Sequence, residues 1–212
     1  MNKISFSKIG IVNYGMGNLG SVVNVFKHLG HDPYIILEPK DVEKADVIIL
    51  PGVGAFGEAM TNLHERHFVD VLSEQVLVKK KFFLGICLGM QLLAESSEEK
   101  GTHRGLGWIP GHVKKLNVDS SLRLPHMGWN DLILHGNSPI YSSLSDSKAV
   151  YFVHTYYFDC DSKYIDAYVE YGKQVTASIH HDNIFAVQYH PEKSHSNGLK
   201  ILSAFLQYTS QS

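Results

Sequence analysis

The most informative segment of the 212-residue sequence is Phe82-Phe83-Leu84-Gly85-Ile86-Cys87-Leu88-Gly89-Met90-Gln91. Its apolar beginning is typical of a buried strand, and the pattern after Cys87 is typical of a helix. The glycines at Gly85 and Gly89 give the spacing of a nucleophile elbow, G-x-S-x-G, with cysteine in the serine position. Side chains at these two positions would collide with the neighbouring helix and strand. The segment therefore predicts a strand, a strained turn that carries Cys87, and a helix.

We interpret Cys87 as a nucleophile. At a helix N-terminus the helix dipole favours thiolate over thiol, and the backbone N–H of Leu88 would point toward a developing oxyanion. The alternative is a buried structural cysteine that behaves as a small hydrophobe. The two flanking glycines, at a switch from strand to helix, favour the nucleophile.

A cysteine nucleophile needs a histidine as its base, and that histidine needs a carboxylate to orient it. The segment Val187-Gln188-Tyr189-His190-Pro191-Glu192 supplies both groups after a predicted strand. The strand would deliver His190 to the sheet edge, where Glu192 is close enough to fold back on the imidazole. Alternatively, His190 is a loop histidine with a solvated neighbour, because short His-x-Glu pairs also arise by chance. Together with Cys87, the segment predicts a Cys-His-Glu triad.

The rest of the chain predicts an α/β fold with a central, mostly parallel sheet flanked by helices, and a smaller antiparallel sheet from the second half. The predicted strands are 9–13, 34–37, 47–50, 82–86, 113–116, 131–134, 149–153, 167–171, 177–181 and 184–188. The predicted helices are 22–29, 58–75, 88–94 and 198–208. There is no internal repeat, low-complexity segment or linker, so residues 1–212 are expected to form a single domain.

Composition excludes several classes of function. The net charge is −2, with no basic block, so neither a nucleic-acid partner nor an anionic membrane surface is expected. No apolar run reaches the ~18 residues of a membrane span, and residues 1–8 lack the features of a signal peptide, which predicts a cytoplasmic protein. The thirteen histidines and two cysteines, Cys87 and Cys160, show no metal-ligand spacing. We therefore expect no metal, no cofactor and no required disulfide.

With both reactive segments in place, the sequence resembles the class I glutamine amidotransferases of the Cys-His-Glu type. Further segments narrow the resemblance to the glutaminase subunits of imidazole glycerol phosphate synthases. These segments are Asn13-Tyr14-Gly15-Met16-Gly17-Asn18, Pro51-Gly52-Val53-Gly54-Ala55-Phe56-Gly57, Pro125-His126-Met127-Gly128-Trp129-Asn130 and Tyr151-Phe152-Val153-His154-Thr155-Tyr156-Tyr157. In the relatives of GMP, CTP, anthranilate and pyridoxal phosphate synthesis, Pro-Gly-Gly is usual where this chain has Pro-Gly-Val-Gly.

The resemblance implies a flavodoxin-like class I amidotransferase fold and the hydrolysis of L-glutamine to glutamate and ammonia through a thioester on Cys87. It also implies an oxyanion hole built from the backbone of Gly52, Val53 and Leu88. The residues that it implies for glutamine binding are Gln91, His154, Thr155 and Tyr156.

The resemblance further implies a heterodimer with a cyclase subunit of the (β/α)8-barrel type. That subunit receives the ammonia and makes imidazole glycerol phosphate and AICAR in histidine biosynthesis. The expected interface residues are Tyr14, Asn18, Trp129, Tyr151 and Lys193. Core packing is the alternative role for the two aromatic residues Trp129 and Tyr151, and Lys193 is alternatively an ordinary solvated lysine.

Two departures from the family pattern are Asn13, where aspartate is common, and Tyr189, where phenylalanine is common. Neither touches the expected triad. Three other functions stay open at this point. One is a paralogous subunit that supplies ammonia for surface-polysaccharide synthesis, another is a generic cysteine amidohydrolase, and the third is a non-catalytic scaffold. The intact triad argues against the scaffold.

Overall fold

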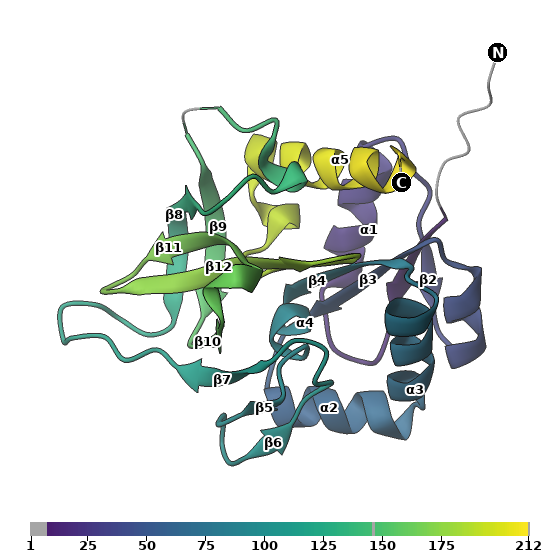
Figure 1. Ribbon diagram of the computed structural model, residues 1–212, viewed down its shortest axis with the longest axis horizontal. Helices are drawn as coiled ribbons and strands as arrows, with labels where there is room; N and C mark the ends of the chain where they lie inside the picture. Colours follow the sequence, from purple (N-terminus) through teal and green to yellow (C-terminus); the bar gives the residue numbers. More distant parts are fainter. Residues whose placement is uncertain (1–7, 146, 212) are drawn as a thin grey trace.

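A nine-stranded sheet forms the centre of the protein, in the order β2-β1-β3-β4-β13-β12-β11-β8-β9 (Figure 1). This is a computed structural model that describes residues 8–145 and 147–211. Residues 1–7, on which the expectation about a signal peptide mainly depends, lie outside the described part. Within that part, no helix combines the length and the apolar character needed to cross a membrane.

The first half of the sheet is parallel, as predicted. Its strands are β1 (Ile9–Val12), β2 (Tyr34–Ile36), β3 (Val47–Gly52), β4 (Phe82–Cys87) and β13 (Ile184–Val187). Every residue of β1, β3 and β13 is buried. Continuous burial is expected for parallel strands that are covered on both faces, because neither face meets water.

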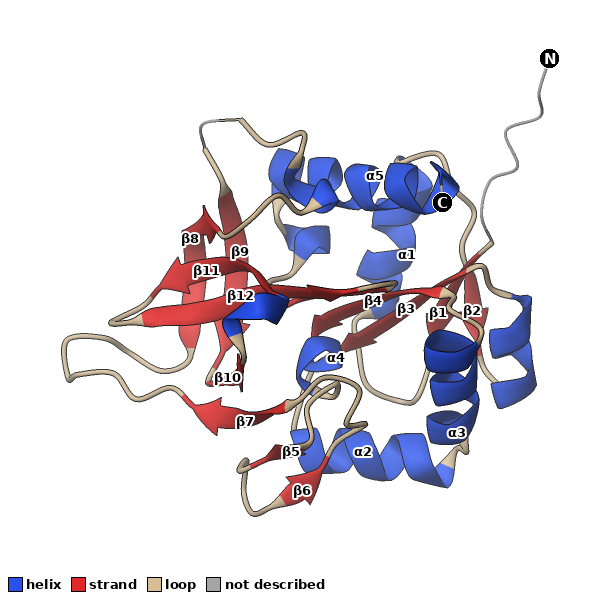
Figure 2. Ribbon diagram, viewed as in Figure 1, coloured by secondary structure: helices blue, strands red, loops and turns tan. Residues whose placement is uncertain are grey.

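Helices cover both faces of this sheet (Figure 2). On one face lie α1 (Leu19–His28) and α5 (His195–Gln211), and on the other lie α2 (Phe56–Glu65) and α3 (Phe68–Ser73). The short helices are α4 (Leu88–Gln91), η1 (Pro39–Lys44), η2 (Glu74–Val78), η3 (Pro139–Tyr141), η4 (Ser162–Tyr164) and η5 (Pro191–Lys193). The predicted C-terminal amphipathic helix is confirmed as α5.

Most strands of the second half extend the central sheet. They are β8 (His126–Leu134), β9 (Ala149–His154), β11 (Ile165–Glu170) and β12 (Gln174–His181), which pair with their neighbours in antiparallel fashion. A separate four-stranded sheet contains β10 (Tyr156–Cys160), β7 (Gly111–Lys115), β5 (Ser96–Ser97) and β6 (His103–Arg104). The smaller sheet is mixed, because β5 and β7 run parallel.

The helix predicted over 58–75 is divided in the structure. His67 adopts a left-handed conformation with φ 57°, which ends α2 and turns the chain into α3. α2 also begins earlier than predicted, at Phe56, where the carboxylate of Glu99 accepts the backbone N–H at 2.8 Å. The helix predicted over 88–94 is only one turn long, because Leu93 and Ala94 donate to carbonyls three residues back.

The nucleophile turn is closely packed against the neighbouring strand. A Cβ added to Gly89 would lie 1.8 Å from the carbonyl oxygen of Leu50 in β3. A Cβ added to Gly85 would lie 2.7 Å from the carbonyl oxygen of Gly89. Both contacts are with backbone, in β3 for Gly89 and in α4 for Gly85, which cannot move without displacing those elements. The structure therefore confirms that both flanking positions require glycine.

We expect Gly89→Ala to lower the free energy of unfolding by about 3 kcal/mol or more, because its Cβ has no space against β3. Urea denaturation followed by circular dichroism measures the change. The matched control is Gly20→Ala in α1, where nothing lies within 4 Å of the added Cβ. Alanine there should be neutral or stabilise by up to about 1 kcal/mol. Equal stability of the two variants would contradict the packing argument.

Candidate active site

Cys87 lies at the carboxyl end of β4 in a conformation that non-glycine residues rarely adopt. Its φ is 55° and its ψ is −109°. Such a conformation costs on the order of 1–3 kcal/mol and persists only where the surrounding packing imposes it. Its side chain is 7% exposed and opens onto a cavity of about 460 Å³. The turn therefore presents a nearly buried sulfur to a space large enough for a small ligand.

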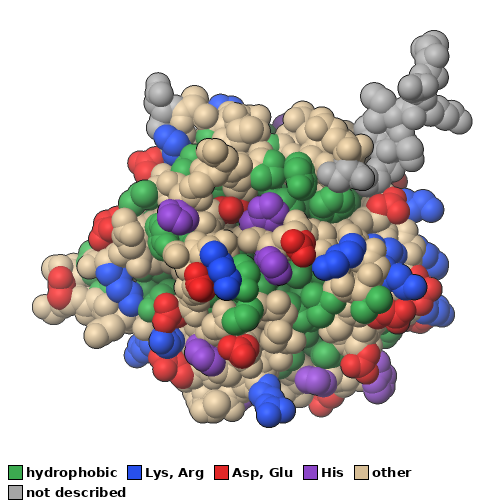
Figure 3. All heavy atoms as spheres, viewed as in Figure 1, with side chains coloured by type: hydrophobic (Ala, Val, Ile, Leu, Met, Phe, Trp, Pro, Cys, Tyr) green, Lys and Arg blue, Asp and Glu red, His purple; other side chains and the backbone are tan. Residues whose placement is uncertain are grey.

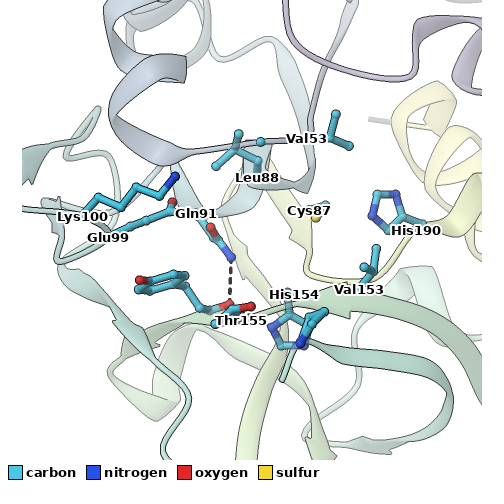
Figure 4. Close-up of a pocket in the computed structure, with 13 residues that line it drawn as sticks. Val53, Cys87, Leu88, Gln91, Glu99, Lys100, Val153, His154, Thr155 and His190 are labelled. Carbon is cyan, nitrogen blue, oxygen red and sulfur yellow. Dashed lines mark hydrogen bonds between the residues drawn. The ribbon is translucent and has the colours of Figure 1, made fainter. Parts of the chain in front are cut away.

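The cavity collects residues that are far apart in the sequence (Figure 4). All four residues predicted to bind glutamine line it: Gln91, His154, Thr155 and Tyr156. Val53 and Leu88 of the predicted oxyanion hole also line it, and Gly52 pairs with Cys87 between β3 and β4. In Figure 4, His190 lies on one side of Cys87 and Gln91 on the other.

His190 and Glu192 form a buried pair. Nδ1 of His190 lies 2.8 Å from Oε1 of Glu192, and their side chains are 3% and 2% exposed. Since a carboxylate accepts, Nδ1 carries the proton, and Nε2 is left without a hydrogen bond among the described residues. Burial lowers the pKa of His190, but interactions with Cys87 and Glu192 outweigh burial and raise it to about 10. The imidazolium is therefore the stable form at neutral pH.

Gln188 is a buried residue that our prediction of the site did not include. Its Nε2 lies 3.8 Å from Sγ of Cys87, and its Oε1 accepts a hydrogen bond of 2.9 Å from Nε2 of Gln91. Gln188 precedes His190 by two positions, and residues two apart in extended chain share a face. This spacing is the pattern by which the sequence could have identified Gln188.

His154 lines the cavity, but both of its ring nitrogens already have hydrogen-bond partners in the protein. Nδ1 lies 2.8 Å from the carbonyl oxygen of Tyr156, and Nε2 lies 3.0 Å from Nδ1 of His126. The carbonyl requires a proton on Nδ1 of His154, so Nε2 accepts from His126. Burial lowers the pKa of His154 to about 3 and that of His126 to about 4. Both imidazoles are therefore neutral.

Glu99 and Lys100 place one charge of each sign at the cavity, and neither was among the predicted site residues. They follow β5 in a turn where Lys100 has φ 54°. Oε2 of Glu99 accepts from the first N–H of α2. No recognisable motif marks this turn. Among the described residues, no group of three or more His, Cys, Asp and Glu side chains could hold a metal ion.

Four of the five predicted interface residues reach the surface. Trp129 is 47% exposed, Tyr151 is half-buried, and Asn18 and Lys193 are exposed. The Trp129 ring stacks on His195, with centroids 4.8 Å apart and planes at 1°, and meets Tyr151 edge-on at 6.0 Å. Trp129 is thus not a core residue.

Tyr14 is different, because its side chain is completely buried. A Cβ added to Gly52 would lie 2.3 Å from the Tyr14 hydroxyl oxygen, so this ring packs beneath the end of β3. In this structure Tyr14 has no exposed surface for a partner. It supports the segment that carries Gly52 and Val53.

The two neutral histidines predict how stability depends on pH. Their folded-state pKa values lie below the unfolded value of 6.5, so the unfolded chain binds more protons between pH 4 and 6.5. Their contribution to stability is complete above pH 6.5 and is lost as the pH falls. Each histidine should remove about 2 kcal/mol of the free energy of unfolding between pH 6.5 and 4.5, so we expect about 4 kcal/mol from the pair.

The variant His126→Phe isolates this effect. It keeps a ring between Phe152 and Tyr171, on which the imidazole stacks, and removes one titrating group. Urea denaturation at pH 6.5 and 4.5 should show a smaller loss of stability in the variant than in the native protein. Identical losses would mean that the histidine pair does not control the acid side of the stability profile.

The chain matches the family described as glutamine amidotransferase class-I over residues 10–207. It is 48% identical to "Imidazole glycerol phosphate synthase subunit HisH 2" of Vibrio vulnificus, over 95% of this chain and 94% of that protein. It is 47% identical to "Imidazole glycerol phosphate synthase subunit HisH 1" of Campylobacter jejuni, over 94% and 99%. The solved structure of PurLQS from Thermotoga maritima has the same fold, with a TM-score of 0.75 at 17% identity over 95% of this chain and 98% of that one. The family match over residues 10–207 and the two relatives show that this protein is a member of the class I glutamine amidotransferase family.

Proposed function

We propose that this chain is the glutaminase subunit of an imidazole glycerol phosphate synthase and acts in histidine biosynthesis in the cytoplasm. The observation that carries the proposal is the cavity in which Cys87 meets the buried pair of His190 and Glu192. The two relatives named above, at 47% and 48% identity, support the choice of pathway. L-Glutamine is the substrate.

In the first half-reaction, the thiolate of Cys87 attacks the side-chain carbonyl carbon of glutamine. The carbonyl electron pair moves onto oxygen, where the N–H of Leu88 and the peptide of Gly52–Val53 stabilise it. The imidazolium of His190 gives its Nε2 proton to the amide nitrogen. The C–N bond breaks, ammonia departs, and a thioester with Cys87 remains. Glu192 keeps the imidazole oriented throughout.

In the second half-reaction, water replaces the sulfur. Neutral His190 takes a proton from the water, whose oxygen bonds to the thioester carbon. The C–S bond then breaks, the electron pair returns to the sulfur of Cys87, and the new carboxyl group loses its remaining proton to solvent as glutamate leaves. The electron pair is again on sulfur and the proton is again on His190, which is the form of the imidazole that its raised pKa favours.

The cavity also suits the α-amino acid end of the substrate. Nε2 of Gln91 already donates to Tyr156 and Gln188, so only Oε1 is left to accept a hydrogen bond from the substrate ammonium. Glu99 and Lys100 add one negative and one positive group, which matches a zwitterion.

We assign the partner interface to the surface around Trp129, with Tyr151, Lys193 and Asn18. Aromatic residues that are half exposed and stacked in a rigid arrangement are typical anchors of protein interfaces. Met127, which is 61% exposed, lies on the same strand. We propose that a (β/α)8-barrel cyclase subunit docks here as a heterodimer and receives the ammonia.

We expect Cys87→Ala to lower glutaminase turnover at least ~10³-fold in the complex with the cyclase subunit, because no other group can form the thioester. Glutamate release measures the turnover. The matched control is Cys160→Ala, at the end of β10, which should retain activity.

The same genes also test the pathway. Together with its cyclase gene, the native chain and Cys160→Ala should rescue a histidine auxotroph that lacks both subunits, and Cys87→Ala should not. Failure of the well-expressed native pair would refute the assignment to this pathway.

We expect Trp129→Ala to weaken binding of the cyclase subunit at least ~10-fold, because truncation of a central aromatic anchor typically costs 2 kcal/mol or more. Isothermal titration calorimetry measures the affinity. Val78→Ala is the control, since Val78 is 71% exposed but belongs to η2. If both substitutions leave the affinity unchanged, the interface lies elsewhere.

A further inference from the structure

Gln188 is a completely buried polar residue in contact with the reactive sulfur. Its Nε2 lies 3.8 Å from Sγ of Cys87, within the longer range of hydrogen bonds to sulfur. We propose that Gln188 is a further catalytic residue, whose carboxamide donates a hydrogen bond to the Cys87 thiolate. The inference rests on the role of Cys87 proposed above, and it adds a group to the site that neither the triad nor the oxyanion hole contains.

The surrounding contacts determine which end of the carboxamide faces the sulfur. The carbonyl oxygen of Tyr156 can only accept, so the Gln91 atom that lies 2.9 Å from it must be the amide nitrogen. That nitrogen also lies 2.9 Å from Gln188, where it must meet the oxygen Oε1. The remaining end of the Gln188 carboxamide is its NH2 group, and it is directed at Cys87. The Tyr156 carbonyl therefore fixes the orientation of both carboxamides, and it identifies the NH2 group of Gln188 as the donor to Cys87.

The Tyr156 carbonyl is held in place from a second side. Nδ1 of His154 donates to the same oxygen at 2.8 Å, and His126 supports His154 at 3.0 Å. A carbonyl oxygen with two lone pairs accommodates both donors, Gln91 and His154. We therefore assign Gln91 and His154 as positioning residues, which act on the sulfur only through the orientation of Gln188.

The chemistry explains why an additional donor is needed. A thiolate on a residue that is only 7% exposed loses most of the hydrogen bonds of water and must recover them from the protein. α4 is a single turn, so its dipole contributes little to the charge on Cys87. The imidazolium of His190 becomes neutral when it protonates the amide nitrogen that leaves as ammonia. The proton on Nε2 of His190 thus leaves and returns during the reaction, whereas the carboxamide of Gln188 keeps its protons and can donate to the sulfur both before the attack and when the electron pair returns.

The test measures the thiol itself and does not depend on glutamine turnover. The 212-residue chain is alkylated with iodoacetamide at pH 5 to 10, and mass spectrometry of the Cys87 peptide gives the rate separately from Cys160. In Gln188→Leu we expect the rate at pH 7 to fall about tenfold and the profile to move up by about one pH unit. At pH 10 the rates should converge with those of the native protein, because at high pH the thiol ionises with or without the hydrogen bond from Gln188. A change in access to the sulfur would instead lower the rate at every pH.

Two further variants keep the test decisive if Gln188→Leu does not fold. Gln188→Glu keeps the size and the acceptor for Gln91 but places a carboxylate beside the sulfur, so its profile should move up at least as far. Gln91→Leu releases the oxygen of Gln188, and its rate at pH 7 should fall by a smaller factor, about threefold. A merely structural role for Gln188 would not predict any change in the pH profile of Gln91→Leu.

The control is Gln75→Leu, because Gln75 is another buried glutamine, located in η2 outside the cavity. Its alkylation profile should match that of the native protein. The proposal is overturned if the folded Gln188 variants, as judged by circular dichroism, keep the native profile. That result differs from failure of the proposed function, in which Cys87→Ala would retain glutaminase activity whatever the alkylation profiles show.

Discussion

The contact between Gly89 and the carbonyl of Leu50 is the constraint on which the site depends. It brings the start of α4 against β3 so closely that no side chain fits between them. Cys87 can then complete the turn only with a positive φ, and the resulting strain is supported by the burial of the strands on either side. Gly52 pairs with Cys87 across β3 and β4, so the segment that follows β3 lies next to the sulfur.

The order of strands in the sheet assembles the rest of the site. β3, β4 and β13 are adjacent and parallel, so their carboxyl ends meet at one edge. Gly52 and Cys87 are the last residues of β3 and β4, Val53 follows β3, and His190 follows β13. Residues separated by more than a hundred positions thus become neighbours because parallel strands end together. The pairing of Val187 with Ile86 sets how far His190 extends beyond the sheet edge.

This arrangement explains what could be predicted from the sequence. Cys87 and the pair His190–Glu192 belong to local patterns, with two glycines around one and a strand before the other, so no contact information was needed. Glu99 and Lys100 reach the cavity only through the fold. β10 was missed because Thr155 separates it from β9 by a single residue. The division of the helix over 58–75 depends on one backbone angle at His67. The burial of Tyr14 likewise depends on its packing under Gly52, which no local pattern records.

Three buried histidines near the cavity differ in charge although their side chains are chemically identical. Nδ1 of His190 meets a carboxylate, whose charge stabilises the imidazolium. Nδ1 of His154 meets the carbonyl of Tyr156, and its other nitrogen meets Nδ1 of His126, so a second proton on His154 would set two N–H groups against each other. The positive charge of His190 further lowers the pKa of His154. One histidine in the cavity is therefore able to move protons, and the other is restricted to holding the Tyr156 carbonyl. The sequence alone does not distinguish these roles, because they are set by which oxygen each imidazole meets.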